Sequence, residues 1–268
     1  MAQITSIRNP RIKQAIQLRR RRGRQQQHRI IVDGAREIWR ALSNGVEAKE
    51  LFVSSDLAPS ELAEQILAHA ESVGLRPVSV APDVFRQLAF GDRDDGLVLV
   101  AARPDTLLDR IPLRQQSIIA VLENIEKPGN VGAVLRSADA AGVDAVILTG
   151  GGTDLFNPNA IRASMGAIFH VPVAVASMAV LHEWLQTHAV NLYAARVDGT
   201  VCYDAISYQR PAAIILGNEA SGLSDQWQGP NVHAVRIPMR GIVDSLNVSV
   251  SAAILFYAAT NPNDSGPV

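Results

Sequence analysis

Short apolar runs alternate with stretches of helical period through the first hundred residues of the chain. A helical period is typical of a helix with one buried face, and a short run rich in β-branched residues is typical of a buried strand. The runs predict strands at Ile30–Val32, Leu51–Ser54, Pro77–Val80 and Leu97–Ala101. The periodic stretches predict helices through Ile38 and Leu42, around Leu62–Ala70 and near Val84–Leu88. This part of the chain therefore resembles a small α/β unit.

The apolar runs of the second half are continuous, without alternating polar positions. Strands that are buried on both faces of a parallel sheet have this character. The runs are Ile118–Leu122, Ala145–Leu148, Val171–Ala176, Leu192–Val197, Ala212–Leu216 and Val235–Ile237. Helical segments separate them near Val131–Ala141, Asn159–Ile168, Met178–Thr187 and Leu246–Ala259. The alternation predicts an α/β domain with a doubly wound sheet.

A boundary between the two halves is expected at residues 103–115. This stretch contains Pro104, Pro112, five charged side chains and little apolar periodicity. A length of 268 residues also favours two domains over one. We therefore expect a first domain at residues 1–102, a linker at 103–115 and a second domain at 116–268.

The composition is that of a globular protein outside a membrane. Hydrophobic residues make up 47% and charged residues 19%, which is enough for a sizeable core. The longest apolar stretches fall short of the roughly 20 residues that a transmembrane helix needs. The N-terminus also lacks the apolar segment of a secretory signal, so we expect a mature protein. A single cysteine, Cys202, fits a reducing compartment, and we expect the cytoplasm.

Positive charge is concentrated at the N-terminus, although the net charge of the chain is only −1. Residues 1–32 hold nine of the 25 basic residues and no acidic residue. Such a segment attracts a polyanion by releasing its counterions, and nucleic acid is the commonest polyanion. The alternative is a solvated tail. The residues expected to bind RNA are Arg8, Arg11, Lys13, Arg19, Arg20, Arg21, Arg22 and Arg24.

Motifs for nucleotides and metals are incomplete. Gly150-Gly151-Gly152 follows a predicted strand, but the third glycine position of the dinucleotide motif Gly-x-Gly-x-x-Gly falls on Leu155. His182 and Glu183 begin a His-Glu-x-x-His zinc motif that position 186, a glutamine, does not complete. We therefore expect no metal.

Three segments of the second half each follow a predicted strand and contain polar residues that a core does not need. In the first, Pro128-Gly129 predicts a turn, Asn130 occupies a position suited to a helix N-cap, and Arg136 follows on the helix. The second is Gly217-Asn218-Glu219-Ala220-Ser221-Gly222-Leu223, which places a carboxylate where open α/β sheets bind ligands. In the third, Pro238 ends a strand and Asp244 or Ser245 is suited to cap the last helix, with Asn247 in its first turn. Singly, each segment is also compatible with an ordinary turn or cap.

Together, the three segments resemble the motifs of the SpoU branch of the SPOUT RNA methyltransferases. The matching residues are Asn130 to Arg136, Gly217 to Leu223, and Ile237 to Ser249. The resemblance covers about residues 117–260. The N-terminal part is similar to the substrate-binding domain often fused ahead of this catalytic domain. One departure is that the first motif opens with Glu123 and reads Lys127-Pro128, where the family commonly has Asp and Asp-Pro.

The resemblance implies a fold, a cofactor and a reaction. The fold is a small α/β substrate-binding domain followed by an α/β SPOUT domain whose last segment, from about Leu216, is tied into a deep trefoil knot. The reaction is transfer of a methyl group from S-adenosylmethionine to a ribose 2′-hydroxyl of ribosomal or transfer RNA, with ribosomal RNA preferred. The family is also dimeric.

Roles for individual residues follow from the same resemblance. The catalytic candidates are Arg136, Asn130, Glu219, Ser245 and Asn247. The cofactor candidates are Leu216, Gly217, Ile237, Met239, Leu246 and Asn247. In the family the arginine is proposed to activate the 2′-hydroxyl. Since a guanidinium stays protonated in proteins, we interpret Arg136 as a phosphate clamp and electrostatic stabiliser.

Two other functions are compatible with parts of the sequence. A non-catalytic RNA-binding protein that kept the fold is expected to have lost Arg136 or Asn247, and both are present. An unrelated phosphate-handling or nucleotide-handling α/β enzyme is expected to contain a phosphate loop, and the sequence has none.

Overall fold

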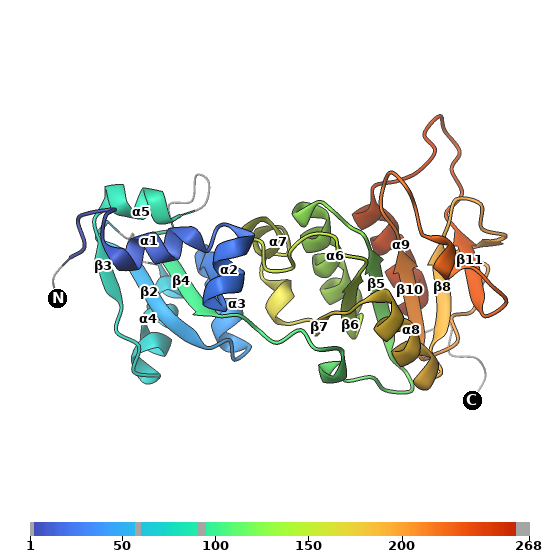
Figure 1. Cartoon of the computed structure of the whole chain (residues 1–268), viewed down its shortest axis with the longest axis horizontal. Helices are drawn as coiled ribbons and strands as arrows, with labels where there is room; N and C mark the ends of the chain where they lie inside the picture. The colour runs from blue at the N-terminus through green and yellow to red at the C-terminus, as the bar shows by residue number, and fades with distance from the viewer. Residues whose placement is uncertain (1–2, 57–59, 90–94, 261–268) are drawn as a thin grey trace. The chain divides into compact units, whose positions relative to one another are not determined.

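The computed structural model describes residues 3–56, 60–89 and 95–260, and it divides into two compact units. The first contains residues 1–104 together with residues 154–170, and the second contains residues 105–153 and 171–268. Figure 1 labels most of the elements of both. In the described part of the chain, no helix is long and apolar enough to span a membrane.

The N-terminal unit contains a four-stranded sheet in the order β1-β4-β2-β3. Its strands are β1 (Arg29–Asp33), β2 (Ala48–Ser54), β3 (Val78–Val80) and β4 (Leu97–Ala102). Its helices are α1 (Pro10–Gln17), α2 (Arg21–Gln27), α3 (Ala35–Ser43), α4 (Glu61–Ser72) and α5 (Pro82–Leu88). Ile12 of α1 and Phe85 of α5 pack with Phe52 of the sheet, so α1 and α5 cover the same face. The strands and helices predicted for this unit are confirmed.

The basic N-terminal segment is folded rather than a solvated tail. Arg24 is only 2% exposed, and its guanidinium forms an ion pair of 2.6 Å with Asp154 and donates to the Leu18 carbonyl oxygen at 2.6 Å. Arg19 is half-buried and donates to the Ala89 carbonyl oxygen. Burial lowers the pKa of Arg19, and the charge of Asp33 partly offsets this effect. Arg24, expected at the RNA surface, is therefore a structural residue, because its charge is already neutralised inside the unit.

The segment 154–170 differs from its predicted helix. The structure has a short helix α7 (Pro158–Ala163) and a separate 3-10 turn η2 (Ala167–Phe169). Gly166, with φ of +86°, interrupts the helix between them, and a Cβ there would lie 3.0 Å from the Arg40 side chain. Arg40 donates to the Met165 carbonyl oxygen at 2.7 Å. These contacts hold the segment within the N-terminal unit.

The C-terminal unit contains a seven-stranded parallel sheet in the order β7-β6-β5-β10-β8-β11-β9. Its strands are β5 (Ile118–Glu123), β6 (Ala145–Thr149), β7 (Val173–Val175), β8 (Asn191–Ala195), β9 (Val201–Cys202), β10 (Ala212–Leu216) and β11 (Val232–Arg236). Its helices are α6 (Pro128–Ala141), α8 (Met178–Thr187) and α9 (Val248–Thr260). The predicted strand at Val235–Ile237 begins earlier, because Val232 is already paired with Leu192 of β8. The short β9 was not predicted.

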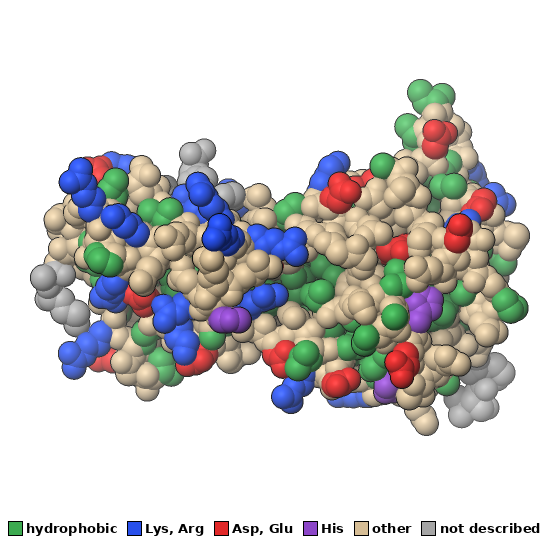
Figure 2. All heavy atoms as spheres, viewed as in Figure 1, with side chains coloured by type: hydrophobic (Ala, Val, Ile, Leu, Met, Phe, Trp, Pro, Cys, Tyr) green, Lys and Arg blue, Asp and Glu red, His purple; other side chains and the backbone are tan. Residues whose placement is uncertain are grey.

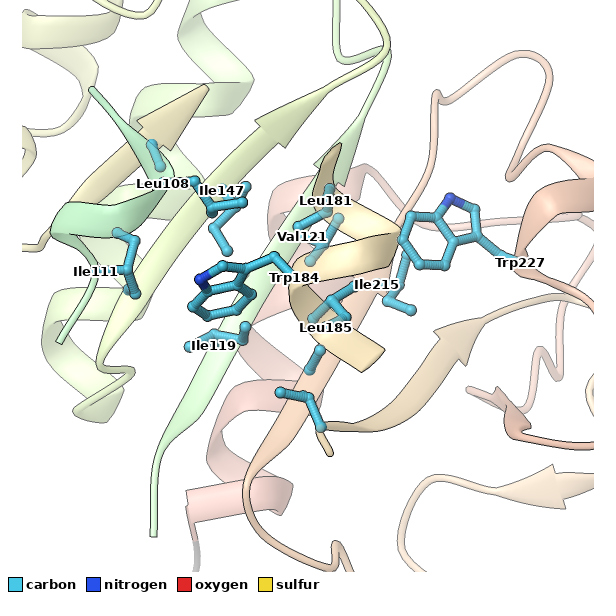
Figure 3. Packing of buried hydrophobic residues seen from close by; sticks show 14 of the residues in the cluster. Leu108, Ile111, Ile119, Val121, Ile147, Leu181, Trp184, Leu185, Ile215 and Trp227 are labelled. Atoms are coloured by element: carbon cyan, nitrogen blue, oxygen red, sulfur yellow. The ribbon is translucent and has the colours of Figure 1, made fainter. Parts of the chain in front are cut away.

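Helices cover both faces of this sheet. Figure 3 shows Trp184 of α8 pointing toward Ile119 and Ile147 of the sheet. Leu108 and Ile111, from the expected linker, belong to the same cluster. On the other face α6 packs against α9. The mixed α/β fold with a parallel sheet is confirmed, while the knot implied by the resemblance stays a prediction.

Candidate active site

A cavity of about 600 Å³ opens at the carboxyl ends of β10, β8 and β11. Such ends are where open α/β sheets bind ligands, and the volume falls within the range of small-molecule sites. Five of the six expected cofactor residues line this cofactor cavity, together with two of the expected catalytic residues: Leu216, Gly217, Ile237, Met239 and Leu246, with Glu219 and Ser245. The segments after three separate strands thus converge on one space.

Gly217 allows the backbone of the loop 217–223 to fold back on itself. A Cβ at this position would lie 2.4 Å from the carbonyl carbon and oxygen of Gly222, closer than real Cβ atoms approach. Asn218 closes the same turn, since its Oδ1 accepts from the Ala220 backbone at 2.8 Å and its carbonyl oxygen accepts from the Gly222 backbone at 2.8 Å. The loop therefore forms a close-packed wall of the cavity.

A chain of hydrogen bonds links the three motifs. The Asn130 amide donates to Glu219, and the Asn247 amide donates to Asn130 Oδ1 at 3.4 Å. Asn247 Oδ1 in turn accepts from the Ser249 backbone at 2.9 Å and from the Ser249 hydroxyl at 2.7 Å. Glu219, Asn130 and Asn247 thus lie side by side at the cavity, although up to 117 residues separate them.

Both predicted caps are wrong. Helix α6 begins at Pro128 with Lys127 at the N-cap, because proline suits the first helical position. Asn130 therefore lies in the first turn and its side chain is free to reach Glu219. Helix α9 begins at Val248. The side chain of the preceding residue Asn247, rather than that of Asp244 or Ser245, accepts a hydrogen bond from the backbone amide of Ser249 in the first turn.

Arg136 lies farther along α6, and its side chain is exposed. It is not among the described residues that line the cofactor cavity. Of the other expected catalytic residues, Glu219 and Ser245 line the cavity, while Asn130 and Asn247 are linked to Glu219 by hydrogen bonds. Arg136 faces solvent.

Glu123, the departure from the family motif, anchors the second motif. It is 2% exposed at the end of β5, where its two oxygens accept from the Ser224 backbone at 2.9 Å and from the Ser224 hydroxyl at 2.6 Å. Ser224 directly follows the loop 217–223. The acid at this position is therefore structural, because it fixes the end of the loop that forms the cavity wall.

Replacing Glu123 by alanine is expected to lower the free energy of unfolding by about 1–3 kcal/mol, because two polar groups of Ser224 lose their partner in a part-buried site. Glu123→Gln keeps an acceptor and is expected to lose less. Denaturant titration measures both, with Glu183→Ala on the exposed surface of α8 as the control. Unfolding of Glu123→Ala at the wild-type midpoint would show that the anchor is unimportant.

Charged residues that the sequence did not predict also line the cavity. Arg196 and Asp198 follow β8 and form a bidentate pair with bonds of 2.8 and 3.0 Å. The bond raises the pKa of Arg196 and lowers the pKa of Asp198. With Glu219 and Asp244, the lining carries three carboxylates and one guanidinium, which suits a cationic ligand. Their position next to β10 depends on strand order, which local sequence does not reveal.

Metal ligands are not grouped in the parts of the chain that the structure describes, where no three His, Cys, Asp or Glu side chains converge. S-adenosylmethionine does fit the cofactor cavity, since the lining offers apolar contacts for its adenosine beside carboxylates that suit its positive charge.

Comparison with known proteins matches both units to families. The model of the SpoU rRNA Methylase family matches residues 117–257, and that of the MRM3-like substrate binding domain matches residues 9–99. A 23S rRNA (uridine(2479)-2′-O)-methyltransferase of Streptomyces viridochromogenes is 30% identical, over 88% of this chain and 84% of its own. The 23S rRNA (guanosine(2553)-2′-O)-methyltransferase RlmP of Bacillus subtilis is 27% identical, over 96% of this chain and 98% of its own.

A solved structure shares the fold over most of the chain. It is an AdoMet-bound rRNA methyltransferase from Sinorhizobium meliloti, 28% identical, with a TM-score of 0.87 and 96% of each chain covered.

Proposed function

This chain belongs to the SpoU rRNA methylase family, and we propose that it methylates a ribose 2′-hydroxyl of ribosomal RNA with S-adenosylmethionine as donor. The observation that carries the proposal is the bonded set Glu219, Asn130 and Asn247 beside a cavity lined by the expected cofactor residues. A non-catalytic RNA-binding protein has no need of this set, so that alternative is not favoured.

Bound S-adenosylmethionine supplies the methyl group and a sulfonium leaving group. The residues of this chain have the remaining tasks of orientation and charge stabilisation. Leu216, Ile237 and Leu246 provide apolar walls for the cofactor. Asn130 is oriented by Glu219 and Asn247, so its amide is fixed at the edge of the cavity. Arg136 stays protonated and is assigned to a phosphate or to the oxygen that attacks.

The function is tested by mapping ribose methylation in ribosomal RNA from cells with and without the gene. One 2′-O-methyl group is expected to disappear in the cells that lack it, and the purified protein is expected to restore it with S-adenosylmethionine. Unchanged methylation of ribosomal RNA, together with no binding of S-adenosylmethionine in calorimetry, would contradict the proposal.

We assign RNA binding to the exposed basic residues of the N-terminal unit. Figure 2 shows Lys and Arg side chains, in blue, gathered over this unit. Arg8, Lys13, Arg20, Arg21 and Arg22 are exposed, and Arg11 is half exposed while paired with Glu50. Arg24 is excluded by its burial, and Arg19 has one nitrogen committed to Ala89.

Replacing Arg20, Arg21 and Arg22 together by alanine is expected to weaken RNA binding and to flatten its salt dependence. Three lost phosphate contacts reduce the slope of log K against log salt by about 2–3. The affinity for S-adenosylmethionine is expected to stay the same. The triple lysine variant preserves the charge and serves as the control; equal slopes for the alanine variant and wild type would remove these residues from the RNA interface.

We further propose that the protein is a homodimer that works in the cytoplasm, where the half-buried Cys202 stays reduced. Helix α9 has no charged residue, yet Val250 and Tyr257 on one side of it are 46% and 58% exposed. Exposed apolar surface of this kind supports a subunit contact.

The dimer is checked by analytical ultracentrifugation. Val250→Glu is expected to shift the protein to monomer, because it places a charge in the contact. Val73→Glu changes a valine of similar exposure, 58%, in the N-terminal unit, and is expected to remain a dimer. A monomeric wild type would contradict the assignment.

A further inference from the structure

A second cavity opens beside the cofactor cavity, over neighbouring strands of the same sheet. It is lined by Asn124 and Glu126 after β5, by Gly150-Gly151-Gly152 after β6, and by Asn218, Ala220 and Ser221 after β10. Because β6, β5 and β10 are adjacent, this space lies on the other side of β10 from β8 and β11. Asn218, Ala220 and Ser221 line both cavities, so their loop is the common wall.

The loops around the second cavity are tied to one another. The Asn124 backbone donates to the Thr149 carbonyl oxygen at 3.0 Å, and the Thr153 backbone donates to the Ile125 carbonyl oxygen at 2.9 Å. A Cβ on Gly152 would lie only 2.4 Å from the same oxygen of Ile125. The Asn218 amide donates to the Asn124 carbonyl oxygen at 3.0 Å. The lining is therefore preorganised for a ligand that lies next to the cofactor.

The chemistry of the lining selects a base rather than a phosphate. Glu126 is exposed and is the single charged residue among the described lining residues, so the cavity repels anions. Of the four RNA bases, guanine alone presents two adjacent donors, N1–H and N2–H, on its Watson–Crick edge, and a carboxylate accepts both at once. The hydroxyl of Ser221 and the amide of Asn124 are donors suited to the O6 atom of guanine.

We propose that this second cavity, the base cavity, holds the base of the target nucleotide and that Glu126 specifies guanine. The inference rests on the proposed function, because a base in this cavity places its ribose beside the wall shared with the cofactor cavity. Asn130 lies four residues after Glu126, at the start of α6, so the catalytic set is close to the same ribose. Membership of the family does not fix the base, since the two relatives above are named for uridine and guanosine.

The first test uses the map of ribose methylation described above. The nucleotide that loses its 2′-O-methyl group is expected to be a guanosine. Loss at uridine, cytidine or adenosine overturns the role of Glu126 while the proposed function stands. Loss at no position contradicts the proposed function itself, so the two failures are distinguishable.

The second test compares RNA fragments that carry guanosine or inosine at the mapped position. Inosine lacks the N2 amino group, so wild-type protein is expected to methylate it roughly 5- to 100-fold more slowly at low RNA concentration. Glu126→Gln is expected to be slower on guanosine and to distinguish the two RNAs much less. Calorimetry with S-adenosylmethionine, expected to be unchanged, shows that this variant is folded.

Glu183→Gln removes an exposed carboxylate outside both cavities and is the matched control. It is expected to keep the full preference for guanosine. If Glu126→Gln discriminates between guanosine and inosine as strongly as wild type, the carboxylate does not read the base and the proposal is overturned.

Discussion

Replacing Arg136 by alanine is expected to slow methyl transfer roughly 100- to 1,000-fold, the usual cost of losing a donor that stabilises charge in the transition state. The affinity for S-adenosylmethionine is expected to stay the same, because Arg136 is exposed on α6 and lies outside the cofactor cavity. A planar guanidinium holds a phosphate or a developing negative oxygen through two hydrogen bonds. Single-turnover methylation at saturating RNA isolates the chemical step from binding.

Two variants sharpen this result. Arg136→Lys keeps the charge but loses the bidentate geometry, so it is expected to recover only part of the rate. Asn247→Ala is expected to weaken binding of S-adenosylmethionine as well as to lower the rate. Asn247 caps the start of α9, and its amide donates a hydrogen bond to Asn130 beside the cavity. Near wild-type turnover by Arg136→Ala would show that the arginine has no part in the reaction.

Replacing Gly217 by alanine is expected to weaken binding of S-adenosylmethionine roughly 10- to 100-fold, because overpacking of this kind costs about 1–3 kcal/mol. The added Cβ would lie 2.4 Å from backbone atoms of Gly222 and 2.6 Å from the Leu223 nitrogen. Backbone atoms have no alternative rotamer, so the loop 217–223 has to move away from β10. Since this loop is a wall of the cavity, the movement changes the shape of the site.

Gly129→Ala is the matched control, because a Cβ at Gly129 meets no atom within 4 Å and the residue also lies in a motif of this site. Calorimetry with S-adenosylmethionine is expected to separate the two variants, while their circular dichroism spectra stay alike. Equal affinities would mean that the loop tolerates the extra methyl group and that its close packing is not required.

The local pattern of apolar and polar residues was sufficient to predict most of the helices and strands. Runs such as Ala212–Leu216 are continuously apolar because the sheet buries them on both faces. It did not predict that β10 lies between β5 and β8, because strand order depends on contacts between distant residues. Arg196 and Asp198 were missed for that reason. They line the cofactor cavity through the position of β8, and nothing in their own sequence marks them.

The sequence motifs predicted site residues more accurately than the distribution of charge did. The second and third motifs predicted the lining of the cofactor cavity well, because they follow β10 and β11, whose carboxyl ends lie at this cavity. The charge run at the N-terminus indicated a basic surface but not the burial of Arg24. Its partner Asp154 lies 130 residues away in the chain, so no local window contains both members of the pair.

The late position of Asp154 in the chain affects how the N-terminal unit forms during synthesis on the ribosome. The N-terminal unit is completed by residues 154–170, which are made after β5, α6 and β6 of the other unit. Until they emerge, Arg24 lacks its counter-charge and Arg40 lacks the Met165 carbonyl. A nascent chain that stops at Pro104 therefore leaves a buried guanidinium uncompensated, which is strongly destabilising. The N-terminal unit therefore cannot be completed until residue 170 has been made, and a cut between β5 and residue 154 would leave both units incomplete.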